Sequence, residues 1–343
     1  METRHRIVGG DAGEMAALPD DSVELVVTSP PYPMVEMWDD LFAERRPETA
    51  DLLASGEGAA AFELMHRDLD AVWAEVARVL VDGGIACVNV GDATRRVDGE
   101  FRLFRNADRI AEAFEGVGLS PLPGVLWRKP ANSAAKFMGS GMLPSNAYVT
   151  QEHEHVLLFR NGGTRSFPPG ADERYEAAFF WEERNRWFSD LWTDVGGDGQ
   201  ALDDGPRERT AAFPVEIPYR LIAMFSVYGD TVLDPFWGTG TTTLAAMAAG
   251  RNSVGYELEP DLIDAFDQRV EEAPSLAAEL VRGRLADHRA FVERRRDDGD
   301  PPGYEAEHYD FPVVTDQERR IRLYTIRRIE ATDEGYRAVH EAA

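Results

Sequence analysis

The chain has 343 residues, of which 43% are hydrophobic, and it carries 36 basic and 62 acidic side chains. That apolar share can bury a core and argues against wholesale disorder, and the length allows one α/β domain with a large insertion or two domains. No apolar run approaches the roughly 18 residues that a membrane helix needs. The N-terminal residues contain no apolar signal core, so we expect a soluble cytoplasmic protein with no membrane partner.

The net charge of −26 would ordinarily count against a nucleic-acid partner. The basic residues weaken that argument, because only Lys129 and Lys136 are lysines and all the others are arginines. Many acidic residues with few lysines are expected of a halophilic protein, and the Debye length of about 3 Å in 1 M salt would screen repulsion from phosphates. A mesophilic acidic protein that avoids polyanions stays an alternative at this point.

Strands and helices alternate along the first part of the chain. Strands are predicted over residues 5–10, 22–28 and 85–90, and the second is apolar enough to be buried on both faces. Residues 38–61 are acidic and rich in small residues, which indicates a mobile insertion. Apolar residues recur at helical spacing from 62 to 80, and Gly83-Gly84 is expected to end that helix.

The middle of the chain loses this periodicity. A helix is predicted over 103–116, with strand candidates at 126–127 and 155–159. Residues 160–211 are rich in Arg, Trp, Phe, Gly and Pro, and we interpret them as an inserted recognition or lid region.

Alternation then returns, with helices predicted over 214–225, 241–249 and 262–270 and strands over 231–234 and 253–257. A basic run, Arg319–Arg328, lies near the C-terminus. The alternation as a whole predicts an α/β fold with a mostly parallel, doubly wound sheet.

Cysteine and histidine give no sign of a metal centre. The single cysteine, Cys87, excludes a disulfide framework and a cysteine-based zinc cluster, and its predicted strand makes it an inert core thiol. His153 and His155 would share one face of a strand, but no third ligand is evident. Core or site-lining roles are favoured for both histidines, and no metal is expected.

A glycine turn follows the strand predicted at 231–234, in the run VLDPFWGTGTT. Such a turn lets the backbone approach a ligand at the carboxyl end of a parallel strand. A phosphate-binding loop would need a lysine after Gly240, where Thr241 stands, and a dinucleotide fingerprint would need a third glycine, where Thr243 stands. A nucleoside ligand without a pyrophosphate fits the loop better.

An acidic residue, Glu257, ends the next strand, where its carboxylate can accept hydrogen bonds from both ribose hydroxyls. The glycine loop and this strand end together favour S-adenosylmethionine as the ligand. The competing interpretation is that Gly238 and Gly240 only make a tight turn and that Glu257 only solvates a strand end.

The strand predicted at 22–28 runs into Ser29-Pro30-Pro31-Tyr32. Two prolines fix the backbone and remove two N–H donors, so the Ser29 hydroxyl and the Pro30 carbonyl are free to accept hydrogen bonds. Both could hold a planar amino group whose ring stacks on Tyr32. That grip would pull a weakly nucleophilic amine toward tetrahedral geometry and aim its lone pair at an activated methyl group. Alternatively, the prolines only break a strand into a loop.

The pairing of TSPPY with a later DPFWGTGTT resembles the β-type amino-methyltransferases of DNA, whose catalytic motif precedes the cofactor motif. The resemblance covers roughly residues 5–290, with supporting matches at 81–92, 126–130, 152–161 and 213–236. It implies a Rossmann-like methyltransferase fold. The chain would divide into a catalytic half (1–160), a target-recognition insertion (161–211), a cofactor-binding half of the same domain (212–290) and a C-terminal extension (291–343).

The resemblance also implies roles for particular residues. The catalytic tetrad would be Ser29, Pro30, Pro31 and Tyr32. The cofactor would have Asp11 near its adenine, Glu257 at its ribose, Phe213 and Pro214 near its methionine part, and Asp234, Pro235, Phe236, Gly238, Gly240 and Thr241 around it. A leading serine is typical of cytosine-N4 enzymes, and the longer run TSPPYPMVEMWD resembles archaeal modification methylases acting on CTAG.

The function so implied is methyl transfer from S-adenosylmethionine to N4 of a cytosine flipped out of double-stranded DNA. Alternatives are an adenine-N6 enzyme, an enzyme acting on an RNA or protein amide, and a non-catalytic DNA-binding protein that senses S-adenosylmethionine. A cognate restriction endonuclease and a second copy of the chain stay open as partners.

Arginines and aromatic residues alternate through 160–211, which favours DNA recognition over a solvated lid. The run Arg319–Arg328 is assigned equally to contact with DNA or a partner and to a solvated helix face. Trp38 and Trp237 flank the two loops and are placed equally in a base pocket and in the core.

Overall fold

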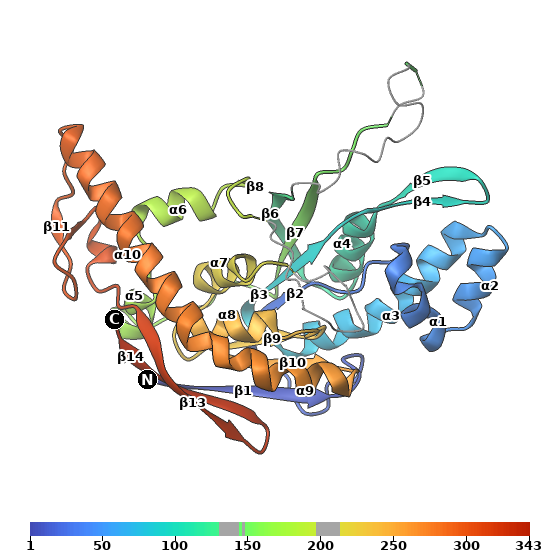
Figure 1. Cartoon of the computed structure of the whole chain (residues 1–343), viewed down its shortest axis with the longest axis horizontal. Coiled ribbons are helices and arrows are strands. Elements are labelled where there is room, and N and C mark those ends of the chain that lie inside the picture. Colours follow the sequence, from blue (N-terminus) through green and yellow to red (C-terminus); the bar gives the residue numbers. More distant parts are fainter. Residues whose placement is uncertain (130–143, 146–147, 197–212) are drawn as a thin grey trace.

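A single large sheet organises the molecule in the computed structural model, which describes residues 1–129, 144–145, 148–196 and 213–343 (Figure 1). Within those ranges its strands follow one another across the sheet in the order β13 (Tyr324–Thr332), β14 (Gly335–Ala342), β1 (Glu2–Gly9), β10 (Asn252–Glu257), β9 (Thr231–Asp234), β2 (Val23–Thr28), β3 (Leu80–Val90), β7 (His153–Arg160), β6 (Ser120–Arg128) and β8 (Leu191–Trp192). The run from β1 to β3 is parallel throughout. The predicted α/β fold with a mostly parallel central sheet is confirmed.

Helices cover both faces of this sheet. One face carries α3 (Gly58–Val79) and α4 (Asn106–Gly116), packed around the buried Trp73 and Phe114. The other face carries α7 (Glu216–Phe225), α8 (Thr241–Ala249), α9 (Pro260–Arg269) and α10 (Ala273–Asp297). All residues of α8 are buried, as expected of a helix that is apolar all round and lies between the sheet and α10.

The chain reverses direction across the sheet between β2 and β9. Strand β2 continues through α3 to β3 on one side, whereas β9 continues through α8 to β10 on the other. The two strands are parallel neighbours, with Leu25 opposite Val232 and Val26 opposite Leu233. Their loops therefore leave the same edge of the sheet on either side of a switch point, where α/β folds bind ligands.

Residues 38–61 are helical, and the prediction of a mobile insertion there is wrong. They form the end of η1 (Glu36–Trp38), then α1 (Asp39–Arg45), α2 (Glu48–Ala54) and the first turn of α3. Their acidic residues stand in the first turns of α1 and α2, where they complement the helix dipole. Ion pairs from Arg45 to Asp11 (2.8 Å) and from Arg46 to Asp68 (2.5 Å) tie α1 and its C-cap to the rest of the molecule.

Gly83 and Gly84 lie inside β3 and do not end α3, which already stops at Val79. At Gly83, φ is +79°, and a Cβ there would stand 2.5 Å from the backbone nitrogen of Arg165. This glycine is therefore required by a close crossing of two chain segments. The helix predicted over 103–116 begins only at residue 106, because the hairpin of β4 (Ala93–Val97) and β5 (Glu100–Phe104) takes its first residues.

The C-terminal part contributes to the main sheet. The hairpin of β13 and β14 pairs antiparallel with β1, and α10 runs across the boundary predicted at residue 290. The alternative that Arg319–Arg328 form a helix face is wrong, since η3 (Asp316–Glu318) ends before this run and β13 begins within it. The smaller elements of this side are α5 (Asp172–Glu176), α6 (Trp181–Trp187), β11 (Tyr304–Glu305), β12 (Pro312–Val313) and the short η2 (Val270–Glu272).

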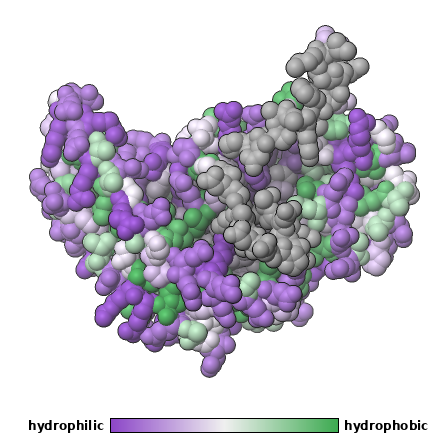
Figure 2. Space-filling view, viewed as in Figure 1, coloured by the Kyte–Doolittle hydropathy of each residue, from purple (hydrophilic) through white to green (hydrophobic). Residues whose placement is uncertain are grey.

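Hydrophilic residues cover most of the face shown in Figure 2, in keeping with the charged composition. Of the helices in the described part of the chain, none combines the length and the apolar character needed to cross a membrane.

Candidate active site

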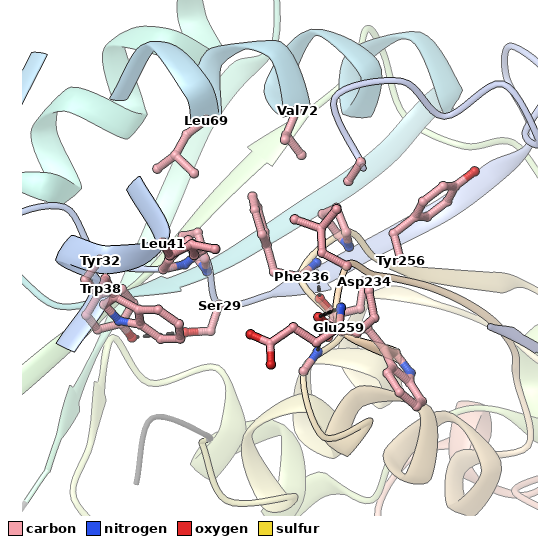
Figure 3. Close-up of a pocket in the computed structure, with 18 of the residues that line it drawn as sticks. Ser29, Tyr32, Trp38, Leu41, Leu69, Val72, Asp234, Phe236, Tyr256 and Glu259 are labelled. Atoms are coloured by element: carbon pink, nitrogen blue, oxygen red, sulfur yellow. Dashed lines mark hydrogen bonds between the residues drawn. The ribbon is translucent and has the colours of Figure 1, made fainter. Parts of the chain in front are cut away.

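A cavity of about 400 Å³ opens at the carboxyl ends of the central parallel strands (Figure 3). The segments after β1, β2, β9 and β10 all contribute to its wall. Tyr32 from the Ser-Pro-Pro-Tyr loop and Gly238 from the glycine loop both line it. The prediction that these two loops face one crevice is confirmed, although about two hundred residues separate them in the sequence.

The glycine loop is shaped by left-handed backbone and held on β10. Gly238 and Gly240 have φ of +55° and +76°, and Gly240 is the N-cap of α8. The Trp237 amide donates to the Tyr256 carbonyl (3.0 Å), and the Gly238 amide donates to Oε2 of Glu257 (2.7 Å). The carboxylate at the end of β10 thus fixes the loop while bordering the cavity. Burial raises the pKa of Glu257.

Asp234 joins the two halves of the site. Its carboxylate accepts hydrogen bonds from the hydroxyls of Thr28 (2.6 Å) and Thr242 (2.7 Å) and from the amide of Phe236 (3.1 Å). It therefore links the end of β2, the glycine loop and the start of α8. The residue borders the cavity, but these contacts give its carboxylate oxygens a structural task. Burial raises its pKa from 3.8 to about 6.

The raised pKa of Asp234 predicts a pH-dependent stability. The folded protein holds this proton more tightly than the unfolded chain, so the stabilisation is complete below about pH 4 and is lost as pH rises through about 6. The Asp234→Asn variant cannot titrate there. Urea unfolding across this window should show the stability of the wild type falling relative to the variant by about 3 kcal/mol. A constant difference would contradict the prediction.

The Ser-Pro-Pro-Tyr loop presents Ser29 to the cavity, with Tyr32 beside it (Figure 3). The Ser29 Oγ and the Tyr32 hydroxyl are 3.0 Å apart. The Tyr32 hydroxyl also meets Oε2 of Glu154 (3.0 Å) and Nδ2 of Asn89 (3.0 Å). Burial and the Glu154 charge raise the pKa of Tyr32 well above its ordinary value, so the phenol stays protonated.

Apolar side chains form the rest of the wall. Leu69 and Val72 of α3 and the ring of Phe236 face the cavity in Figure 3, and Trp38 lies next to Tyr32. Of the two tryptophans placed equally in pocket and core, Trp38 belongs to the pocket. Trp237 is fully buried and donates from Nε1 to Thr243 (2.8 Å), so its ring belongs to the core even though it borders the cavity.

All the residues predicted for catalysis and cofactor binding line this cavity except Pro214 and Gly240. Pro214 precedes α7, where its carbonyl accepts from Ile217 (3.0 Å), and Gly240 starts α8 behind the loop. The sequence reasoning missed Lys129, Glu154 and Arg45, which also line the cavity. Strand alternation held the signal for Glu154, because it points opposite to the two histidines on either side.

The histidine pair shares one face of β7 as predicted, with ring centroids 5.0 Å apart. His155 lies 4.0 Å from Asp92. No group of three or more metal-ligating side chains occurs among the residues that the structure describes. Cys87 is fully buried in β3, and burial raises the pKa of its thiol, so the prediction of an inert core cysteine is confirmed.

Several arginines assigned to DNA recognition have acidic or aromatic partners. Arg165 forms an ion pair with Asp230 (2.5 Å) and Arg186 with Asp287 (3.2 Å), while Arg174 lies over the Phe167 ring. Arg207 and Arg209 lie outside the described residues. DNA recognition by 161–211 therefore stays a prediction.

A doubly wound sheet with a glycine loop and a Ser-Pro-Pro-Tyr loop on one cavity defines the class of nucleoside-binding transferases that act on amino groups. A family model for DNA methylases, of the N6/N4 methyltransferase type, matches residues 23–268. The chain belongs to this DNA methylase family.

Individual relatives agree with this assignment. The chain is 48% identical to the Type II methyltransferase M.MthZI of Methanothermobacter thermautotrophicus, over 94% of this chain and 91% of that protein. It is 50% identical to the Type II methyltransferase M.MjaI of Methanocaldococcus jannaschii, over 79% of this chain and 92% of that protein. Among solved structures, the DNA modification methylase TTHA0409 from Thermus thermophilus, complexed with S-adenosyl-L-methionine, matches with a TM-score of 0.62 and 32% identity, over 78% of this chain and 94% of that one.

Proposed function

We propose that this DNA methylase transfers a methyl group from S-adenosylmethionine to N4 of cytosine in double-stranded DNA, at CTAG sites. The observation that carries the proposal is the shared cavity, in which Ser29 and the glycine loop face one space. A leading serine favours cytosine N4 over adenine N6 through the family resemblance. The run TSPPYPMVEMWD supports CTAG in the same way.

The cavity walls suit S-adenosylmethionine. Leu69 and Val72 offer an apolar surface to a flat adenine ring, and Asp11 borders the same space. Glu257 already accepts from the amides of Gly238 and Glu259, but each carboxylate oxygen has a second lone pair that a ribose hydroxyl can use. The glycine loop exposes backbone where the methionine part would lie, near Phe213. When bound, S-adenosylmethionine supplies a methyl group activated by a sulfonium.

The chain's own residues prepare the base for attack. A cytosine flipped from the duplex stacks on Tyr32 and Trp38, and its amino hydrogens are accepted by the Ser29 hydroxyl and the Pro30 carbonyl. These acceptors favour a pyramidal nitrogen, whose lone pair then points at the methyl group. They also stabilise the positive charge that develops on that nitrogen. Most of the acceleration therefore comes from positioning.

Wider roles follow from the same proposal. Two archaeal relatives are named Type II methyltransferases, which supports a cytoplasmic modification enzyme with a cognate restriction endonuclease. Residues 161–211 would read the target sequence. A two-fold CTAG site would suit a homodimer, because palindromic sites mirror protein symmetry.

Identifying the methylated nucleoside tests the proposal. The purified protein is incubated in concentrated salt with S-adenosylmethionine and duplexes that contain or lack CTAG, and the DNA is digested to nucleosides for mass spectrometry. We expect N4-methyldeoxycytidine only from the duplex with CTAG. N6-methyldeoxyadenosine would refute the choice of base, and equal methylation of both duplexes would refute the choice of site.

A further inference from the structure

A hydrogen-bonded chain runs away from Ser29 into the protein. It passes from Ser29 Oγ to the Tyr32 hydroxyl (3.0 Å) and from there to Oε2 of Glu154 (3.0 Å). Asn89, at the end of β3, donates from Nδ2 to both Tyr32 (3.0 Å) and Glu154 (2.6 Å). The chain thus joins the loop after β2 to β3 and β7, and its last carboxylate is only 12% exposed.

The chemistry of these groups fixes the direction of the hydrogen bonds. A carboxylate only accepts, so the single hydroxyl hydrogen of Tyr32 goes to Glu154, its strongest acceptor. The Asn89 carbonyl is a weaker and more distant competitor at 3.5 Å. The Tyr32 oxygen then has its lone pairs left for the Asn89 amide and for the hydrogen of Ser29.

The orientation of Asn89 supports this direction. With Nδ2 toward Glu154 it makes two hydrogen bonds, whereas its Oδ1 is buried with no hydrogen-bond partner. Turning the amide over would aim that oxygen at the Glu154 carboxylate and replace attraction with repulsion. Lys129 completes the arrangement, since its Nζ lies 2.9 Å from the other carboxylate oxygen and supplies the charge that a nearly buried carboxylate needs.

We propose that Glu154 is a positioning residue for methyl transfer, which acts through Tyr32 to turn the hydrogen of Ser29 away from the cavity. This inference rests on the proposed function. A serine hydroxyl can donate as well as accept, and donation to the base nitrogen would occupy the lone pair that must attack the methyl group. With its hydrogen committed to Tyr32, Ser29 presents only lone pairs to the amino group.

The Glu154→Gln variant tests the direction of the chain. Its amide nitrogen can donate to Tyr32, which would let Tyr32 donate to Ser29 and turn the Ser29 hydrogen into the cavity. We expect kcat to fall about 10- to 100-fold, as for a misplaced catalytic group. The Kd for S-adenosylmethionine should stay within about twofold, because Glu154 lies on the Ser29 side of the cavity.

A double-mutant cycle separates this role from others. Tyr32→Phe removes the hydroxyl through which Glu154 acts, so adding Glu154→Gln to that variant should change kcat less than about twofold. An equally large loss in both backgrounds would overturn the proposal, because it would mean direct contact with the base or a merely structural role. Glu154→Asp repeats the cycle if Glu154→Gln does not fold.

The matched control is Glu152→Gln on the same segment, where Glu152 pairs at the surface with Arg128 (3.2 Å). It should keep the wild-type kcat. The nucleoside product is identified for every variant. If the wild type makes N6-methyldeoxyadenosine, the proposed choice of base fails, while the cycle still decides whether Glu154 acts through Tyr32.

Discussion

Replacing Ser29 with alanine is expected to lower kcat by about 10²- to 10³-fold, as removal of one preorganised hydrogen-bonding group commonly does. The variant keeps the Pro30 carbonyl as one acceptor for the base amine but loses the other. The Tyr32 ring stays anchored by Glu154 and Asn89, so the stacking surface should survive. The loss should therefore appear in the chemical step.

Cofactor binding should be unaffected by Ser29→Ala, because the glycine loop is held by Tyr256 and Glu257 and not by Ser29. Single-turnover methylation measures the chemical step, and calorimetric titration with S-adenosylmethionine measures binding. Ser22→Ala is the matched control, since Ser22 precedes β2 at its other end, where its hydroxyl donates to the Pro19 carbonyl (2.7 Å). Full activity in Ser29→Ala would refute the assigned role of Ser29.

The central strands and both loops could be predicted because their signals are local. Residues 23–28 are apolar and end directly in the prolines, and Val232 and Leu233 lead directly into the glycine turn. The hairpin of β13 and β14 lacked such a signal. Its place in the sheet depends on pairing with β1 at the other end of the chain, as between His5 and Tyr336, and no short window of sequence carries that information.

Composition misled the prediction at 38–61. Acidic and small residues are common in loops, but here Asp39 accepts an ion pair from Arg95 (2.7 Å), and Phe42 is buried, so tertiary contacts hold α1 in place. The site shows the same limit. Glu154 reaches Tyr32 across 122 residues, and only the pairing of β7 with β3 brings them together.

The glycine loop carries the second large effect, in the Gly240→Ala variant. Gly240 has φ of +76°, and a Cβ there would lie 2.5 Å from Cε2 of Phe266 and 2.8 Å from Cζ2 of Trp237. Both rings are buried and pack edge to face at 4.8 Å, so neither has room to withdraw. Left-handed strain of about 1–2 kcal/mol and overpacking of about 1–3 kcal/mol should together lower the free energy of unfolding by about 2–5 kcal/mol.

Gly99→Ala separates these two causes. Gly99 also has φ of +76°, but it lies in the turn between β4 and β5, where an added Cβ meets nothing within 4 Å. Urea unfolding should show only the strain of about 1–2 kcal/mol for Gly99→Ala. The excess loss in Gly240→Ala then measures the collision with Phe266, and Phe266→Leu in the same chain should recover part of it. Equal losses in the two alanine variants would mean that the rings yield, and the loop would then owe its glycine to backbone conformation alone.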